Sequence, residues 1–234
     1  MSGKLSKRTA LTLLILVVAV PCLMVLLHSV WGSRKYFLAS ILLVALACVP
    51  FLLRFEGRKP QARELVLLSI MTALAVVGRI AFVWIPSFKP LAAIVILTGV
   101  AFSPEAGFIT GAAAALLSNF YFGQGIWTPW QMLGFGLLGF LGGLIFSGRP
   151  VKRIPLVLYG FFSTLILYGL LLDTANVLMM GAAMTWPTVL ASWASGVSFN
   201  LIHAGATALF LLLLQKPLLE KLRRVRIKYG LLDE

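Results

Sequence analysis

The sequence predicts an all-α integral membrane protein with about eight transmembrane helices. Hydrophobic residues make up 60% of its 234 residues and charged residues only 12%, so too little polar surface remains to cover a soluble globule. Long apolar stretches alternate with short polar or basic segments, which is typical of a multi-span protein. We expect an amino-terminal transmembrane hairpin with a basic linker in residues 1–60, a six-helix membrane core in 61–215 and a basic cytoplasmic tail helix in 216–234.

The first three spans are predicted by length. Segments 11–30 and 36–53 are apolar, and at about 1.5 Å per residue each can cross a hydrocarbon core of roughly 30 Å. No small-x-small cleavage site leads from the first segment into a polar region, so we interpret it as a retained helix and not as a signal peptide. After a charged linker, residues 65–84 form the third span, which carries Arg79.

The fourth apolar segment is too short to span alone. Residues 91–102 lie between prolines and would rise only about 18 Å as a helix. Irregular backbone at membrane depth is tolerated only where protein covers it or where it lines a cavity. We therefore expect the preceding segment 84–90, which includes Lys89, to fold into the protein.

Residues 104–143 form a central helix pair rich in small residues. Gly107, Gly111, Ala115 and Asn119 recur every fourth residue, so another helix can approach closely along this stripe, which ends in an amide. The glycine-rich second helix follows after an irregular segment, 123–131, that contains Pro129. The pair is predicted to pack backbone to backbone and to grip a ligand at its irregular end; lipid-embedded packing with an interfacial loop is the alternative.

The last third of the chain adds two spans and the tail. Residues 154–184 are apolar and longer than a span needs, and they carry Asp173 and Asn176. A break at 185–188 precedes the final span, 191–214, in which Asn200 lies one turn from His203 and is its expected partner. In the tail, apolar residues recur at helical spacing among basic ones, which predicts a helix on the inner membrane surface.

The basic residues set the orientation. With the amino terminus inside, 16 of the 20 Lys and Arg residues lie on the inner side, namely Lys4, Lys7, Arg8, Arg54, Arg58, Lys59, Arg63, Arg149, Lys152, Arg153, Lys216, Lys221, Arg223, Arg224, Arg226 and Lys228. The positive-inside rule therefore predicts a multi-pass protein of the cell membrane with both termini in the cytoplasm.

All six tryptophans then fall on the outer side: Trp31, Trp84, Trp127, Trp130, Trp186 and Trp193. An aromatic belt should favour both interfaces, so we also expect a ligand cavity lined by the outer breaks at 84–86, 127–130 and 186–187. Arg79, Asn119 and Asp173 reach the same height. Arg79 and Asp173 are a candidate buried pair, although a snorkelling arginine and an interfacial aspartate would give the same pattern.

Several classes of function are disfavoured by the motifs that are missing. The chain has no phosphate-binding Gly-x-x-x-x-Gly-Lys-Ser/Thr loop, no metalloprotease or serine-hydrolase motif, and too few acidic residues for a metal site. We expect no catalytic residues, no cofactor and no nucleic-acid partner; the basic clusters contact membrane lipid. Cys22 and Cys48 lie in apolar spans and are expected to pack in the core. An ion-coupled secondary transporter remains an alternative.

Residues 62–215 resemble a known transporter family. The segments Ala73-Leu-Ala-Val-Val-Gly-Arg79, Pro86-Ser-Phe-Lys-Pro90, Ile94-Val-Ile-Leu-Thr-Gly99 and Ser118-Asn-Phe-Tyr-Phe-Gly-Gln-Gly-Ile-Trp-Thr-Pro-Trp-Gln131 are similar to the substrate-binding S components of energy-coupling factor (ECF) vitamin importers, most of all those assigned to cobalamin and other corrinoids. The resemblance implies a six-helix subunit that binds a vitamin at the outer face and docks on a transmembrane coupling subunit with two cytoplasmic ATPases. Another vitamin, such as riboflavin, is the alternative ligand.

Two sets of residues are predicted to carry this function. The vitamin would contact flat aromatic and polar side chains near the outer face, and these are Arg79, Trp84, Lys89, Asn119, Tyr121, Gln124, Trp127, Trp130, Gln131, Asp173, Asn176, Trp186 and Asn200. The resemblance places the coupling subunit against small residues of the third span, Ser69 and Ala73.

Overall fold

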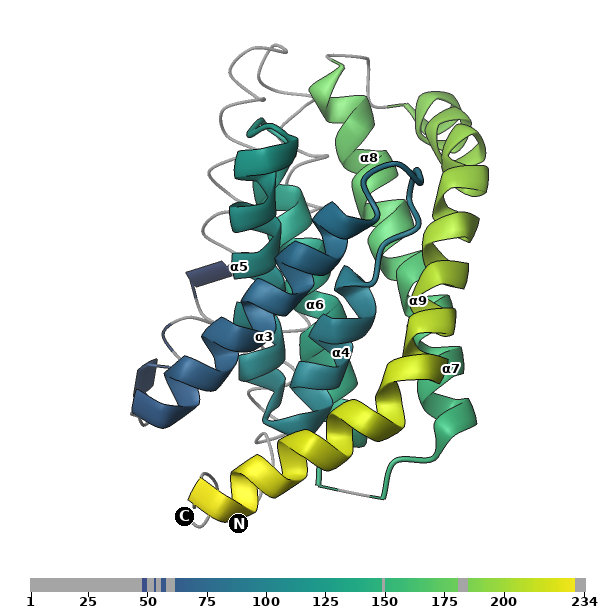
Figure 1. The fold of residues 1–234 in the computed structure, drawn as a ribbon. Helices are drawn as coiled ribbons and strands as arrows, with labels where there is room; N and C mark the ends of the chain where they lie inside the picture. The colour runs from purple at the N-terminus through teal and green to yellow at the C-terminus, as the bar shows by residue number, and fades with distance from the viewer. Residues whose placement is uncertain are drawn as a thin grey trace.

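The computed structural model describes residues 62–148, 150–180 and 185–229, together with positions 48, 49, 53, 56 and 57. Every regular element of these residues is helical (Figure 1). The elements are α3 (Ala62–Ala81), α4 (Leu91–Ala101), α5 (Pro104–Phe122), α6 (Thr128–Phe146), α7 (Arg153–Phe162), the π-helix η1 (Ser163–Tyr168), α8 (Gly169–Met179) and α9 (Trp186–Tyr229). The predicted spans 11–30 and 36–53 lie outside these residues except for positions 48, 49 and 53.

Four of the described helices are long and apolar enough to cross a membrane: Ala62–Ala81, Thr128–Phe146, Arg153–Met179 and Trp186–Val225. The third of these joins α7, η1 and α8 into one rod, as residues 154–184 predicted. The structure therefore confirms an all-α membrane protein, and the total of about eight spans stays a prediction.

Glycines let α4, α5 and α6 pack backbone to backbone. A methyl group on Gly107 would lie 2.5 Å from the carbonyl oxygen of Gly139, and one on Gly111 would lie 2.5 Å from that of Phe135. A side chain at either position therefore has no room. Gly99 meets Gly139 in the same way from α4. The small-residue stripe of α5 faces α6, which confirms the predicted close approach.

The short helix α4, which is too short to span a membrane alone, lies at the centre of the bundle. All of its 11 residues are buried, and it contacts α3, α5, α6 and α9 (Figure 1). The loop before it only partly folds inward. Ser87 and Pro90 are buried, whereas Trp84 is 88% exposed, so the predicted covering by protein is wrong for the tryptophan.

Helix α9 corrects the predicted carboxyl-terminal organisation. It is one helix of 44 residues, with Pro217 inside it, where we expected a span over 191–214 followed by a separate tail. Proline removes a backbone hydrogen bond and bends a helix, and the yellow end of α9 turns to run below α3 and α4 (Figure 1). Leu222 on this end packs in the core cluster, so the tail lies against the protein as well as carrying exposed basic residues.

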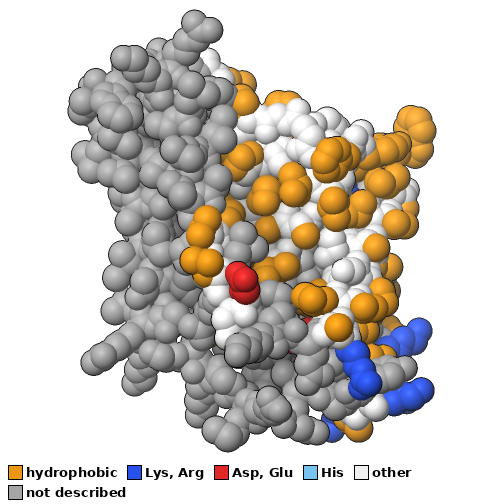
Figure 2. All heavy atoms as spheres, turned by 90° about the vertical axis from the view of Figure 1, so that its left-hand side faces the viewer, with side chains coloured by type: hydrophobic (Ala, Val, Ile, Leu, Met, Phe, Trp, Pro, Cys, Tyr) orange, Lys and Arg blue, Asp and Glu red, His pale blue; other side chains and the backbone are white. Residues whose placement is uncertain are grey.

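The surface divides along the bundle. Hydrophobic side chains cover the upper part of the described face, and lysines and arginines gather below them (Figure 2). The exposed apolar residues of α3 include Leu65, Val66, Ile70, Leu74 and Val77. A hydrophobic band above a basic end is the pattern expected of a protein whose band contacts lipid and whose basic end follows the positive-inside rule.

Candidate functional site

Polar side chains meet where α3 and α5 end and α6 begins. The Arg79 Nη1 group donates hydrogen bonds to Ser118 Oγ at 2.5 Å and to Asn119 Oδ1 at 2.9 Å. Asn119 in turn donates from Nδ2 to Thr128 Oγ1 at 3.0 Å and to Gln131 Oε1 at 2.8 Å. We call these five residues the Arg79 cluster. It joins three helices through side chains alone.

The asparagine is the hub of this cluster. Its side chain is 1% exposed, and both ends of its amide are bonded, so the free energy of burying it is offset. Asn119 continues the stripe that faces α6, which confirms the predicted direction of its amide. Thr128 also receives a bond from the Gly125 backbone N–H at 3.2 Å and donates to Gln124 Oε1 at 3.0 Å. The loop before α6 is thereby tied to the cluster.

A second cation lies beside Arg79. Lys89 Nζ donates to the carbonyl oxygens of Phe82 and Ile85, the latter at 2.9 Å. It lies 5.9 Å from the centre of the Phe122 ring, over which the Arg79 guanidinium carbon lies at 4.5 Å. Burial lowers the pKa of the Lys89 ammonium, and the charge of Arg79 lowers it further. The two positive charges thus share one aromatic ring.

An aromatic group borders the cluster on the inner side. The Phe135 and Tyr168 ring centres are 4.4 Å apart, and His203 lies 5.1 Å from Tyr168. Tyr168 and His203 are both close enough to Arg79 to interact with its charge. Gly134 leaves the space that the tyrosine ring occupies. Four residues of this region were not predicted from the sequence: Tyr168, Ser118, Thr128 and Phe122. The π-helix that positions Tyr168 has no simple sequence signal, although such segments often occur at functional sites.

A different polar group joins α8 to α9, and it corrects two predicted pairings. Asn200 donates from Nδ2 to Asp173 Oδ2 at 2.7 Å. We call these two residues the Asp173 pair. Within the described residues no ion pair joins Arg79 to Asp173, because each has other partners. Asn200 is likewise not the partner of His203, whose ring packs edge-on against those of Phe135 and Tyr168.

The remaining candidates differ in their surroundings. Arg79, Lys89, Asn119, Gln124 and Gln131 come together, whereas the predicted aromatic residues range from buried to almost fully exposed. Their exposed fractions are 88% for Trp84, 74% for Trp186, 60% for Tyr121, 40% for Trp127 and 2% for Trp130. Trp130 packs in an apolar cluster with Cys48 and Phe108. Asn176 makes no side-chain hydrogen bond in the described structure.

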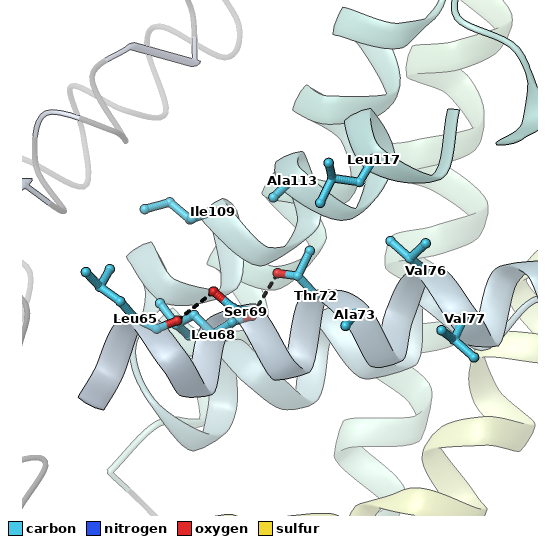
Figure 3. A pocket seen from close by; sticks show the side chains of 10 residues that line it. All are labelled: Leu65, Leu68, Ser69, Thr72, Ala73, Val76, Val77, Ile109, Ala113 and Leu117. Atoms are coloured by element: carbon cyan, nitrogen blue, oxygen red, sulfur yellow. Dashed lines mark hydrogen bonds between the residues drawn. The ribbon is translucent and has the colours of Figure 1, made fainter. Parts of the chain in front are cut away.

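The two predicted docking residues lie on a different surface. Ser69 and Ala73 line an apolar groove of about 440 Å³ between α3 and α5, together with residues such as Ile109, Ala113 and Leu117 (Figure 3). The Ser69 hydroxyl donates to the Leu65 carbonyl of its own helix at 2.9 Å. The hydroxyl hydrogen of the serine is therefore used within its own helix, and the groove presents mainly methyl and methylene groups.

The chemistry of the described residues is that of binding. They contain no group of three or more His, Cys, Asp or Glu side chains that could hold a metal ion. The Arg79 cluster offers hydrogen-bond donors and positive charge beside an aromatic face. Such a site orients a ligand by its polar edge and stacks its flat surface.

Comparison with known proteins decides the family. Residues 59–218 match the sequence family described as "ECF-type riboflavin transporter, S component". The chain belongs to the S-component family of ECF-type transporters. The match covers all the described helices except the last turns of α9, and it excludes the predicted amino-terminal hairpin. No solved structure matches the chain.

This S component is also similar to several UPF0397 proteins. It is 30% identical to one from Aliivibrio salmonicida over 138 residues, which is 56% of this chain and 72% of the relative. It is 31% identical to one from Aliivibrio fischeri over 124 residues, which is 47% of this chain and 67% of the relative. It is 29% identical to one from Vibrio atlanticus over 140 residues, which is 56% of this chain and 72% of the relative.

Membership settles the general role. An S component is the substrate-binding, non-enzymatic membrane subunit of an ECF importer, and its partners are in general a vitamin, a transmembrane subunit and ATPases. This agrees with the absence of an ATP-binding loop from the sequence. The corrinoid specificity expected from the sequence is not supported by the matched family, whose description refers to riboflavin.

Proposed function

We propose that this S component binds a vitamin at the Arg79 cluster, on the extracytoplasmic side, and delivers it to a coupling subunit driven by two cytoplasmic ATPases. The observation that carries the proposal is the Arg79 cluster itself, a buried amide and a cation at the common end of three helices. Buried polar groups of this kind are costly in a membrane bundle unless they serve structure or a ligand. The basic rim at the opposite end supports the orientation.

The vitamin is proposed to be a corrinoid, with riboflavin as the second candidate. The segment Gln124-Gly-Ile-Trp-Thr-Pro-Trp-Gln131 supports the corrinoid through its similarity to corrinoid S components, and the matched family description supports riboflavin. Both ligands are flat ring systems with polar edges. Phe122 and the half-exposed Trp127 supply aromatic faces near the cluster, and Arg79 and Gln131 supply polar contacts.

The groove between α3 and α5 is proposed to receive the transmembrane coupling subunit. Its walls are apolar, and Ser69 and Ala73 keep the floor low enough for another helix to approach. It lies along α3, away from the Arg79 cluster at the end of that helix. Ligand and coupling subunit would thus occupy separate surfaces of one S component.

Calorimetric titration of the purified chain with cobalamin, cobinamide, riboflavin and a nickel salt tests the proposal. Binding heat with a corrinoid supports the corrinoid assignment, and binding heat with riboflavin alone makes riboflavin the assigned ligand. Lys152→Gln is the matched control, because Lys152 is an exposed cation at the opposite end. If no vitamin binds, and a proton or sodium gradient alone drives transport by the chain in liposomes, a secondary transporter replaces the proposal.

A further inference from the structure

No carboxylate among the described residues neutralises the cations of the ligand end. The chain contains 7 acidic residues: Glu56, Glu64, Glu105, Asp173, Glu220, Asp233 and Glu234. None occurs in residues 1–55, so the amino-terminal segments cannot supply a partner. Glu64 and Glu105 lie at the opposite ends of α3 and α5 from the Arg79 cluster, roughly 20 Å away at about 1.5 Å per residue. Asp173 is bonded to Asn200.

Arg79 has hydrogen-bond donors that no described residue uses. A guanidinium carries five N–H donors in a planar fork, and Arg79 uses only Nη1, toward the neutral oxygens of Ser118 and Asn119. Its Nη2 and Nε groups have no hydrogen-bond partner among the described residues. The Nε2 amide group of Gln131 also has none there, since Gln131 is bonded through its oxygen. Two helices, α3 and α6, therefore hold unused donors in one place.

The loop before α4 holds Lys89 beside these donors. At Ser87 the backbone has φ 56°, and the Phe88 N–H donates to the Pro86 carbonyl at 2.7 Å across it. This is a γ-turn, which is rare for a residue with a side chain and often marks a functional site. The turn reverses the chain and brings Lys89 near the Phe122 ring, over which Arg79 also lies.

Two like charges beside one aromatic ring repel each other, and an anion bound between them offsets the repulsion. Burial lowers the pKa of the Lys89 ammonium, and the charge of Arg79 lowers it further. A phosphate or carboxylate accepts from a guanidinium fork in a bidentate manner and from an ammonium as a point charge. An uncharged vitamin would leave the repulsion in place.

We propose that Arg79 and Lys89, with Gln131 beside them, form a subsite for an anionic group, a phosphate or carboxylate, on the transported molecule. The inference rests on the proposed function and narrows its substrate class to vitamins that carry a negative charge next to a flat ring. Phe122 lies beneath both cations, and in the proposed complex it packs against the edge of the vitamin's ring system. The same chemistry could come from a lipid headgroup, so the test separates the two sources.

Paired ligands that differ in the anion test the subsite. Riboflavin is compared with riboflavin 5′-phosphate, and cobinamide with cobalamin, which carries a phosphodiester, by calorimetry on the purified chain in phosphatidylcholine nanodiscs. For the ring system that binds, we expect the anionic member to bind about 10- to 100-fold more tightly, the range given by hydrogen bonds to a charged group. Arg79→Gln and Lys89→Gln should each remove most of this difference, and Lys152→Gln should leave it intact.

The outcomes are distinguishable. Equal affinity for both members of a pair, or a preference that persists in Arg79→Gln and Lys89→Gln, overturns the subsite while the proposed function stands. Binding of neither ring overturns the proposed function. If Arg79→Gln does not fold, the milder Lys89→Gln decides. Phosphatidylglycerol that raises the melting temperature of the wild type but not of Lys89→Gln, with no preference between paired vitamins, assigns the subsite to lipid and overturns its assignment to the substrate.

Discussion

The Arg79 cluster and the Asp173 pair are two polar groups in one apolar bundle, and they are built in opposite ways. In the first, a cation donates to neutral oxygens and keeps further donors unused. In the second, a carboxylate accepts from the amide of Asn200, and Gly169 and Gly196 bring α8 and α9 close enough for this contact. The first group joins three helices at their ends, whereas the second joins two along their sides.

The difference separates binding from packing. A polar contact along the sides of two helices mainly fixes helix register. The Arg79 cluster combines unused cationic donors with a second cation and an aromatic face, which is the chemistry of a ligand site. Burial alone does not distinguish the two groups, since Asn119 and Asn200 are both buried. The excess of positive charge beside an aromatic ring does.

Cysteine labelling gives the largest expected effect, because its result is all or none. If the Arg79 end faces outward, a membrane-impermeant thiol reagent on intact cells should label Tyr121→Cys and not Gly57→Cys, in a background with Cys22 and Cys48 replaced by alanine. Both positions are exposed. Tyr121 is preferred to Gly125, where a new side chain would collide with the Trp127 ring.

Permeabilised cells are the control, and both positions should then react. Labelling of Gly57→Cys alone in intact cells would invert the membrane orientation and make the Arg79 cluster a cytoplasmic site. The difference between the two polar groups would still hold, but the proposal that the protein takes up its ligand from outside the cell would be rejected.

Ala73→Trp tests whether ligand binding can be separated from docking. Ala73 lies in the groove between α3 and α5, and an indole there should block a neighbouring helix. We expect vitamin uptake and co-purification with the coupling subunit to be lost, while ligand affinity of the isolated chain stays within about twofold. Val66→Trp is the control, since it adds the same bulk at an exposed apolar position of α3 that does not line the groove. Loss of affinity with docking preserved would reject the assignment.

Asn119→Ala should disturb the Arg79 cluster more than any single change disturbs the Asp173 pair. It removes the acceptor of Arg79 and the donor to Thr128 and Gln131, and leaves their polar atoms buried. We expect the free energy of unfolding to fall by about 2–4 kcal/mol and ligand affinity to fall at least about tenfold. Thermal unfolding in detergent and calorimetry measure the two effects. Affinity that remains unchanged in a folded variant would exclude the cluster from the site.

Much of the helical framework could be predicted from the sequence. The four-residue spacing from Gly107 to Asn119 places these residues on one face of their helix. This can be inferred from the spacing alone, without knowing which helices lie next to it. The length of the apolar segment between Pro90 and Pro104 likewise predicts a helix too short to span alone. Such features depend on one helix at a time, and the structure confirms them.

Pairings between helices could not be predicted in the same way. Arg79 and Asp173 reach a similar depth, but their partners depend on how α3 and α8 are rotated, and the rotation is decided by packing across the whole bundle. Trp130 lies within the predicted irregular segment 123–131 yet begins the buried face of α6, because the helix starts at Thr128. The continuity of α9 was missed because the apolar span ends at 214 and basic residues follow from Lys216, whereas the helix continues through Pro217.

The smallest effect is expected from Asp173→Asn. The substitution removes the charge but keeps an oxygen that can accept from Asn200, and the shape of the side chain is nearly unchanged. If the Asp173 pair only fixes the contact between α8 and α9, the free energy of unfolding should change by less than about 1 kcal/mol. Ligand affinity should stay within about twofold. Asn176→Ala, one turn further along α8, is the matched control for a substitution that breaks no side-chain bond in the described structure. A tenfold loss of affinity in Asp173→Asn, with normal thermal stability, would place the carboxylate in the ligand site, and the contrast between the Arg79 cluster and the Asp173 pair would no longer separate binding from packing.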